Sequence, residues 1–570
     1  MWYSSGVHVD IVPNRSSRPA ILLREAWREG KRVRKRTIAN LTDHMSLEQA
    51  LALREFLKGQ KLVPAESAFE VTDSKLHGHV LAVLIAMRQL GFEQLLASRP
   101  SRERTLVMAM VAFRVLEAGS KLAVSRAWHD TSLPGELGVA DANEDDLYRA
   151  MDWLASARSR IERKLAKRHL GEGSHALFDL TSSSVDGEHC ELAAFGYNRD
   201  KKRGKKQINW GLLTDTAGRP VAISVFPGNT SDPKTLLPQV EKLRSDFRLE
   251  SFTLVGDRGM ISKAHINEFT GMPGVTWITA LRSASIRPLI ASGVIQASLF
   301  EETNLFEFTH PDYPGERLVA CRNPVLGRKR AHSRSSLLAA TQVELDKIKS
   351  SIEKGNLKAE QKIALKVGGV LGRFRMAKHI KVTISEAHFD YELDQDSIDT
   401  EAQLDGIYII RTNLQSDTLA AGEVVLAYKN LSDVERSFRT MKSPDLQVRP
   451  IHHRLPDRVT AHLFICTLAY YVRWHMQQAW SSLTFQDEHP PEKRDAVLSA
   501  ERSAEATSKA QTRTLPDGQA THSFRTLLNS LRTIVQNDCK HDKTGVTFSM
   551  TTTPNKEQQH ALDLLKSIKL

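Results

Sequence analysis

Apolar residues recur along the chain with more than one period, and each period predicts a different kind of element. Near the N-terminus, Ala20–Arg28 and Lys31–Leu41 predict two strands of a hairpin, and Ser46–Lys58 has helical spacing. Residues 75–170 carry apolar positions every three or four residues, which predicts a series of helices. These helices are compatible with a DNA reader of the helix-turn-helix type and equally with an ordinary helical subdomain, since nothing in them identifies a recognition helix.

Beyond Gly171 the pattern changes to short strand-like runs. Four runs are rich in apolar and β-branched residues: Ala176–Leu180, Asn209–Thr214, Pro220–Val225 and Phe252–Gly256. A helix at Pro233–Arg244 separates the last two. This succession predicts an α/β core with a mixed sheet.

From about Arg282 to Leu404 the core pattern is interrupted. Two charged helices and two alternating strands are predicted there: Ser336–Lys354, Ala359–Lys378, Lys381–Ile384 and His388–Leu393. We interpret this stretch as an inserted α+β subdomain. Helices then resume at Asp417–Ala427, Ser432–Met441 and Pro456–Met476, and the polar segment from Ser481 to about Ser523 predicts a flexible connection.

The patterns divide the chain into six parts. They are an N-terminal β-hairpin and helix (1–60), a helical region (61–172), the first part of a core (173–281), the inserted subdomain (282–404), the second part of the core (405–480) and a C-terminal tail with terminal helices (481–570). A chain of 570 residues is too long for one compact domain, which agrees with a multidomain α/β protein.

The net charge of the chain indicates a class of binding partner. The chain carries 79 Lys and Arg against 67 Asp and Glu, a net charge of +12, which favours a polyanion such as nucleic acid, although it could serve solubility alone. The 41% hydrophobic content excludes a mainly disordered chain. The four cysteines lie far apart, which argues against a disulfide framework or a zinc module. We find no secretory signal and no apolar stretch near the roughly 20 residues of a membrane span, so we expect a cytoplasmic protein with no membrane partner.

Two aspartates follow apolar strands. Asp179 lies at the end of the predicted strand Ala176–Leu180, and Asp257 directly follows the run FTLVG. A carboxylate held at the end of a buried strand suits an oxygen ligand for Mg²⁺ or Mn²⁺. Each aspartate alone is also explained as a turn or helix-cap residue.

A third acidic candidate comes from a spacing of seven. Tyr428, Glu435 and Lys442 would share one stripe of a continuous helix, with Arg439 on the same side. A carboxylate between an aromatic ring and two cations suits a site that meets metal and phosphate. The alternative is a surface ion pair worth about 0.3–0.5 kcal/mol.

Five blocks of sequence carry a family resemblance. LFDLTSS, FGYNRDKKRGKKQINWGLL, VFPGNTSDPKTL, VGDRGMIS and AYKNLSDVERSFRTMK resemble, in order, the landmarks of bacterial insertion-sequence transposases of the DDE type. The branch is the insertion sequence four superfamily, with a Y-x2-R-x3-E-x6-K signature and a subdomain inserted before the glutamate. The resemblance extends from REGKRVRKRTIANL to LQVRPIHHRLPDRVTAHLF. It implies a ribonuclease-H-like catalytic core and a mainly helical N-terminal region that binds DNA ends.

The resemblance also implies the chemistry. Asp179, Asp257 and Glu435 would be the catalytic acids and the ligands of two Mg²⁺ (or Mn²⁺) ions per active site, with Asp179 bridging the two ions. Tyr428 and Lys442 would contact the DNA end. The enzyme would bind terminal inverted repeats, cleave the ends and join their 3′-hydroxyls to target DNA. We expect a homodimer on double-stranded DNA, associated with the bacterial nucleoid. A nuclease without strand transfer and a catalytically silent DNA-binding derivative are the alternatives.

Basic residues predict the path of the DNA. The candidates are the hairpin row Arg32, Arg34 and Arg36, the cluster Arg199, Lys201, Lys202, Arg203, Lys205 and Lys206, and Arg258, Arg436 and Arg439. Each group could instead be a solvated surface. A further group, His452, His453, Arg458 and His462, is less specific, and we expect His462 to be a hydrogen-bonded core histidine.

The sequence departs from the family pattern at two points. The signature arginine falls at Leu431, and Lys429 or Arg436 could replace it only from a different helical phase. Some relatives stack a flipped base on a tryptophan of the inserted subdomain, but this chain has no tryptophan between Trp277 and Trp474. A hairpin DNA intermediate is therefore not supported by the residues, although it stays open, because another aromatic residue could stack instead: Phe300, Phe306, Phe308, Phe374 or Tyr391.

Overall fold

The structure is a computed structural model that describes residues 6–15, 17–59, 69–200, 202, 204–300, 303–491, 495–541 and 545–569. The chain separates into two compact units. The smaller unit contains Met1–Lys75 and Val535–Thr552, and the larger contains Leu76–Ile534 and Thr553–Leu570. The predicted boundary between residues 60 and 61 lies outside the described residues.

A three-stranded antiparallel sheet and one helix form the first part of the smaller unit. The elements are β1 (Gly6–Val12), β2 (Ala20–Glu29), β3 (Arg32–Asn40) and α1 (Leu47–Leu57). The predicted hairpin and helix are confirmed, and β1 is an additional strand. Val9, Ile21 and Ala50 are buried between the sheet and α1. Ser46 begins α1 by accepting the backbone N–H of Gln49, which satisfies an otherwise unpaired donor.

A second three-stranded sheet of this unit was not predicted. It has the order β16-β15-β4 and joins β4 (Phe69–Leu76) to β15 (Val535–His541) and β16 (Thr547–Thr551), so that segments from both ends of the chain pair. Thr72 donates its hydroxyl to the carbonyl of Asp538 at 3.0 Å. Strands β4 and β15 lack a regular apolar alternation, and β16 alternates over only five residues, so the sequence pattern predicted only helices for the tail.

Helices fill residues 78–169 of the larger unit, as the periodicity predicts. They are α2 (Gly78–Gln89), α3 (Phe92–Leu96), α4 (Arg102–Leu116), α5 (Lys121–Ala127), α6 (Leu133–Glu136) and α7 (Glu144–His169). The apolar helix α16 (Pro456–Ala479) packs against α2, α4 and α7 and is buried along most of its length. Helices α18 (Phe524–Leu531) and α19 (Lys556–Lys566) also pack against α2.

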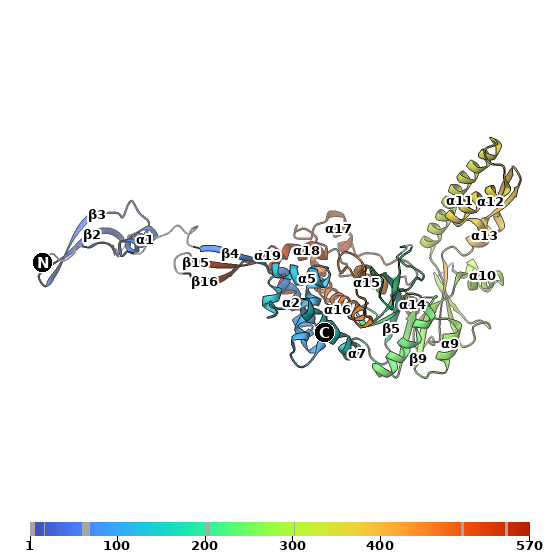
Figure 1. Cartoon of the computed structure of the whole chain (residues 1–570), viewed down its shortest axis with the longest axis horizontal. Coiled ribbons are helices and arrows are strands. Elements are labelled where there is room, and N and C mark those ends of the chain that lie inside the picture. The colour runs from blue at the N-terminus through green and yellow to red at the C-terminus, as the bar shows by residue number, and fades with distance from the viewer. Residues whose placement is uncertain are drawn as a thin grey trace. The chain divides into compact units, whose positions relative to one another are not determined.

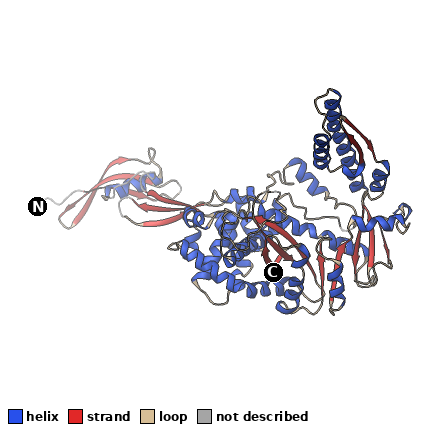
Figure 2. Cartoon of the chain, turned by 45° about the vertical axis from the view of Figure 1, so that its right-hand side comes forward, coloured by secondary structure: helices blue, strands red, loops and turns tan. Residues whose placement is uncertain are grey.

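An eight-stranded mixed sheet lies at the centre of the larger unit and confirms the predicted α/β core (Figure 2). Its order is β10-β11-β14-β9-β8-β5-β6-β7. Four strands match the predicted runs: β5 (His175–Ser184), β6 (Gln207–Thr214), β7 (Pro220–Pro227) and β8 (Phe252–Gly256). Strand β9 (Val275–Ala280) was not predicted. Strands β5, β6 and β7 are antiparallel, whereas β8 and β9 run parallel to β5.

Helices cover this sheet. Helices α7 and α16 pack against β7, α15 (Leu431–Lys442) against β5, and α14 (Ala421–Lys429) against β8 and β9. Shorter helical segments connect the strands: η3 (Asp232–Thr235), α8 (Leu237–Glu241), η4 (Lys242–Asp246) and α9 (Lys263–Thr270). Trp210 of β6 packs edge-on against Phe438 of α15 with ring centroids 5.0 Å apart, which fixes α15 on the sheet.

The segment predicted as an insertion has two structurally different parts. Its first part adds strands to the central sheet through α10 (Ser283–Ala291), η5 (Ala297–Phe300), β10 (Leu305–Phe308) and β11 (Arg317–Arg322), and β14 (Ile407–Thr412) returns the chain to β9. Its second part has a hydrophobic core of its own, built by α11 (Pro324–Glu353), α12 (Glu360–Phe374), β12 (Ile380–Ser385), β13 (His388–Leu393) and α13 (Gln395–Ala402) (Figure 1).

The polar segment after α16 differs from the predicted flexible connection. It contains η7 (Ser481–Leu483) and α17 (Ala504–Thr512), and Val497 is fully buried. Lys509 is also buried and pairs with Glu488 at 2.6 Å. A few anchoring residues in a polar sequence give no periodic signal, so the pattern missed them. In the part of the chain that the structure describes, no helix is long and apolar enough to cross a membrane.

Candidate active site

The register between β5 and β8 brings the first two candidate acids together. The parallel pairing sets Phe178 opposite Gly256, and the next residues along the two strands are Asp179 and Asp257. Asp179 is not at a strand end as predicted, because β5 continues to Ser184 through pairing with β6. The Thr-Ser-Ser-Ser run after Asp179 looks like a turn in the sequence but is buried strand.

Helix α15 adds the third acid to the same place. Glu435 lies on α15, which packs against β5, and Asp179, Asp257 and Glu435 all line one cavity of about 580 Å³. We call this cavity the acid cavity. The three carboxylates also line an adjoining cavity of about 330 Å³. Residues far apart in the sequence thus converge on one site of a size typical of ligand pockets, roughly 300–1,000 Å³.

The electrostatics of the acid cavity are unusual at Asp179. Burial, followed by the charges of Asp257 and Glu435, raises the pKa of Asp179 to about 7, against the opposing effects of a backbone hydrogen bond from Leu180 and of the charge of Arg199. A carboxylate that is desolvated and faces two others is destabilised in its charged form. A cation in the cavity would relieve that destabilisation.

Tyr428 and Lys442, which flank Glu435 in the family signature, contact the walls of the acid cavity. Tyr428 donates its hydroxyl to Asp257 Oδ1 at 3.0 Å, and burial followed by the charge of Asp257 raises the pKa of Tyr428. Lys442 Nζ donates to Thr181 Oγ1 at 2.6 Å and to Asp200 Oδ1 at 2.9 Å. The predicted continuous helix is broken, since α14 ends and α15 begins at Asn430.

Three further residues of this site were missed by the sequence analysis. Asp200 is an acceptor for Lys442 and forms an ion pair with Arg449, and both Asp200 and Arg449 line the acid cavity. Asp232, which pairs with Arg199, lines it as well. Asp200 stands inside the basic run NRDKKRG and Arg449 follows α15, so no local pattern indicated that they would meet.

The structure brings only some of the predicted basic residues to the acid cavity. Arg199 and Arg439 line it, and the charge of Arg258 acts on Tyr428. Four others lie elsewhere: Arg436, which pairs with Asp433 at 2.9 Å, Lys205, which pairs with Asp186 at 2.9 Å, and the exposed Lys202 and Lys206. Lys201 and Arg203 lie outside the described residues.

The arginine row of the N-terminal hairpin is exposed on β3. Arg34 pairs with Glu29 at 2.7 Å and Arg36 with Glu25 at 3.0 Å, while Arg32 lies opposite Glu29 in the strand register. Cross-strand glutamates therefore partly neutralise this row, which lowers the electrostatic attraction it can offer to phosphates.

Leu431 takes the place of the signature arginine. Its side chain is buried and lines the smaller cavity beside the acids, together with Lys429. Lys429 donates to the carbonyls of Val497 at 2.7 Å and Leu498 at 2.9 Å, so it anchors the segment after α16. Neither Lys429 nor Arg436 occupies the position of the signature arginine.

The donor set of the acid cavity fits a hard divalent cation. Carboxylate oxygens are the ligands that Mg²⁺ and Mn²⁺ prefer, and the raised pKa of Asp179 shows the negative charge that such an ion would balance. As the side chains stand, however, no group of three or more His, Cys, Asp or Glu among the described residues is close enough together to hold a metal ion. The hydroxyl of Tyr428 occupies one oxygen of Asp257.

Comparisons with known proteins identify the family. The transposase DDE domain matches residues 170–472, and the N-terminal domain of the IS1634 family transposases matches residues 9–67. No curated protein sequence matches the chain. One solved structure similar to it is the piggyBac transposase synaptic complex with hairpin DNA. The sequence identity is 9%, the match covers 80% of this chain and 78% of that chain, and the TM-score is 0.35. The DDE match covers more than half of the chain and includes all three acids, and the chain belongs to the insertion-sequence transposases of the DDE type.

Proposed function

We propose that this protein binds the terminal inverted repeats of its element, cleaves the DNA ends and joins their 3′-hydroxyls to target DNA by phosphoryl transfer at the acid cavity. The convergence of Asp179, Asp257 and Glu435 on one cavity is the observation that carries the proposal. The strand order β7-β6-β5-β8-β9, with three antiparallel strands followed by two parallel ones, supports a ribonuclease-H-like core.

In this proposal Asp179, Asp257 and Glu435 would hold the divalent metal ions. Bound Mg²⁺ or Mn²⁺ would supply Lewis-acid activation of the attacking oxygen and stabilisation of the leaving one. Asp179 is held rigidly by the β5 ladder and by the backbone N–H of Leu180 at 2.8 Å. Tyr428 positions Asp257 through its hydroxyl, and Lys442 and Arg439 supply positive charge for the phosphates on the side of α15.

Other parts of the chain take supporting roles in the proposal. The helices of residues 78–169 and the N-terminal hairpin would bind the DNA ends, and the subdomain with its own core between β11 and β14 would extend the DNA contacts. Phosphate contacts from Arg199 and the exposed lysines after it would make binding strongly salt-dependent. We also propose a homodimer on DNA, since the two ends of an element must be processed together.

The test is cleavage of the element's own ends by the purified full-length protein. With Mg²⁺ or Mn²⁺ the protein should nick the ends, and Asp257→Ala should abolish nicking while DNA binding remains. Asp433→Asn is the matched control, because Asp433 lies on α15 near Glu435 but lines neither cavity. Undiminished nicking by the Asp257 variant would reject the acid cavity as the site of cleavage.

Two alternatives remain distinguishable by their products. A nuclease without strand transfer would give nicked ends that never become joined to a second DNA. A catalytically silent derivative would bind the ends without turnover in any divalent metal. Recovery of joined products that depend on all three acids separates transposition from both.

A further inference from the structure

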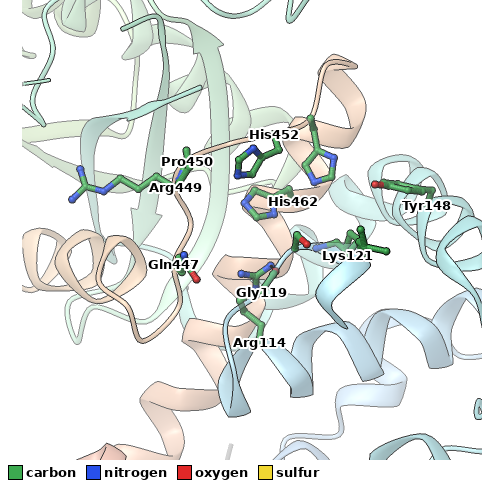
Figure 3. A pocket seen from close by; sticks show the side chains of 12 residues that line it. Arg114, Gly119, Lys121, Tyr148, Gln447, Arg449, Pro450, His452 and His462 are labelled. Atoms are coloured by element: carbon green, nitrogen blue, oxygen red, sulfur yellow. Dashed lines mark hydrogen bonds between the residues drawn. The ribbon is translucent and has the colours of Figure 1, made fainter. Parts of the chain in front are cut away.

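A second cavity of the larger unit is lined by basic side chains. It measures about 150 Å³ and lies where the end of α4 and the start of α5 face residues 447–453 and α16 (Figure 3). Six basic side chains line it: Arg114, Lys121, Arg449, His452, His453 and His462. None of the described residues around it carries a carboxylate. We call it the basic pocket.

Lys121 is the least compensated charge of the basic pocket. The residue is only 4% exposed, and no hydrogen bond or ion pair of its ammonium group is found among the described residues. Burial, followed by the charge of Arg114, lowers the pKa of Lys121 to about 7. A buried charge without a partner costs folding free energy, and an anion that entered the pocket would recover it.

Two neighbouring side chains are fixed at the wall of the pocket. His462 is 6% exposed, and its Nε2 donates to the carbonyl of Val448 at 3.0 Å. Burial keeps the pKa of His462 well below its usual range, so its buried Nδ1 is an unprotonated acceptor and donates no hydrogen bond to an anion. Arg114 donates to the carbonyl of Gly119 at 2.8 Å, so its guanidinium is fixed at the pocket wall. Figure 3 shows Arg114, Lys121 and His462 gathered on one side of the pocket, with His452 beyond them.

The size of the basic pocket limits what it can hold. Its volume exceeds the roughly 10–15 Å³ that one water needs and falls below the roughly 300 Å³ of ordinary small-molecule sites. It therefore suits a single oxyanion and excludes a whole nucleotide. Arg449 lines both the basic pocket and the acid cavity, so the two are adjacent.

We propose that the basic pocket binds one phosphate group, a backbone phosphate of the DNA strand that enters the acid cavity. The identity of the ligand as DNA rests on the function proposed above. The assignment of the ligand as a phosphate group rests on the residues of the pocket alone. A free phosphate ion would present the same group as the DNA backbone. Phosphate oxygens would accept from the Lys121 ammonium, while Arg449 would link the bound phosphate to the site of cleavage.

The test uses Lys121→Met, which keeps the length of the side chain and removes its charge. Arg126→Gln is the matched control, because Arg126 is an exposed cation of the same helix α5 outside the pocket. Thermal unfolding of the full-length protein is followed with inorganic phosphate at constant ionic strength. Binding of a duplex carrying the element's end is measured in EDTA across a range of salt.

We expect phosphate to stabilise the wild type and the Arg126 variant but not Lys121→Met. We expect Lys121→Met to bind the duplex about tenfold more weakly. The slope of log affinity against log salt concentration should become shallower by about 0.9, because one phosphate contact is lost. Without phosphate, Lys121→Met should unfold at a higher temperature than the wild type, because it lacks the unpaired buried charge. A lysine that serves only the fold would give the opposite shift.

A second variant tests the pocket independently, in case Lys121→Met does not fold. Gln447 lies exposed at the edge of the basic pocket, and Gln447→Glu adds a carboxylate there without changing shape. It should also abolish stabilisation by phosphate and weaken duplex binding. Equal stabilisation of all variants by phosphate would overturn the proposal. Phosphate protection with unchanged duplex affinity would assign the pocket to a free phosphate and overturn the DNA contact. Failure of the wild type to nick DNA would reject the proposed function and leave the phosphate result standing.

Discussion

Replacing Glu162 by glutamine should destabilise the larger unit, because Glu162 joins the helical region to the central sheet through buried charge. Glu162 lies on α7 and is 1% exposed. Its carboxylate pairs with Lys242 at 2.9 Å and Arg158 at 3.4 Å, and it accepts the backbone N–H of Ile223 on β7 at 3.1 Å.

The magnitude follows from what the substitution Glu162→Gln leaves behind. The amide oxygen of the new side chain would still accept the N–H of Ile223, but the Lys242 side chain, 13% exposed, would lose its counter-ion. Removing one partner of a buried pair typically costs about 3–5 kcal/mol. Replacing Lys242 by methionine in the same chain removes the stranded charge, so the double variant Glu162→Gln, Lys242→Met should recover a large part of that loss.

The assay is urea unfolding of the full-length protein followed by far-ultraviolet circular dichroism. Asp145→Asn is the control, since Asp145 is exposed in the first turn of the same helix and contributes at most about 0.3–1 kcal/mol through the helix dipole. If Glu162→Gln lowered the free energy of unfolding no more than Asp145→Asn, the buried pair would not stabilise the junction. A double variant as unstable as Glu162→Gln would refute the stranded-charge explanation.

Three further predictions concern the site and the buried histidines. Tyr428→Phe should slow nicking about tenfold or more with little change in duplex affinity, because it removes the hydrogen bond that positions Asp257; a gel assay of nicking and an equilibrium binding assay separate the two effects. Asp179→Asn should raise the unfolding temperature of the metal-free protein and abolish the further stabilisation by Mn²⁺, since it removes a desolvated carboxylate that faces two others; thermal scans with and without Mn²⁺ measure both shifts. Burial lowers the pKa of His169 and His453 to about 3, so the unfolded chain takes up protons first as the pH falls below about 6.5. The urea concentration at the midpoint of unfolding should therefore be lower at pH 5 than at pH 7, and a midpoint that does not change with pH would contradict this.

The local sequence pattern was enough to predict the position of a residue where that position depends only on the helix or strand that contains it. The strand that ends at Gly256 is continuously apolar and buried, so the pattern located it and Asp257 after it. Helix α16 is likewise apolar on nearly all sides because helices and strands surround it, and its length was predicted to within a few residues.

Prediction failed where burial comes from a partner far away in the sequence. The polar end of β5 looks like a turn, and only the pairing with β6 makes it a buried strand. The strands β4 and β15 have no regular apolar alternation, β16 is only five residues long, and β15 pairs with a segment from the other end of the chain. Lys121 looks like an ordinary cation at a helix start, and its burial depends on residues of α16 and of the segment before it.

Asp200 connects the acid cavity to the basic pocket. Its single carboxylate meets two cations, Lys442 and Arg449, so the pair of sites retains positive charge at their junction. Arg449 lines the same cavity as the three acids, and its ion pair with Asp200 gives its charge a partner other than those acids. Had a second carboxylate been present, the positive charge that can meet a phosphate would be cancelled. In the proposed function, a net positive charge between the acid cavity and the basic pocket would let a phosphodiester approach carboxylates that would otherwise repel it.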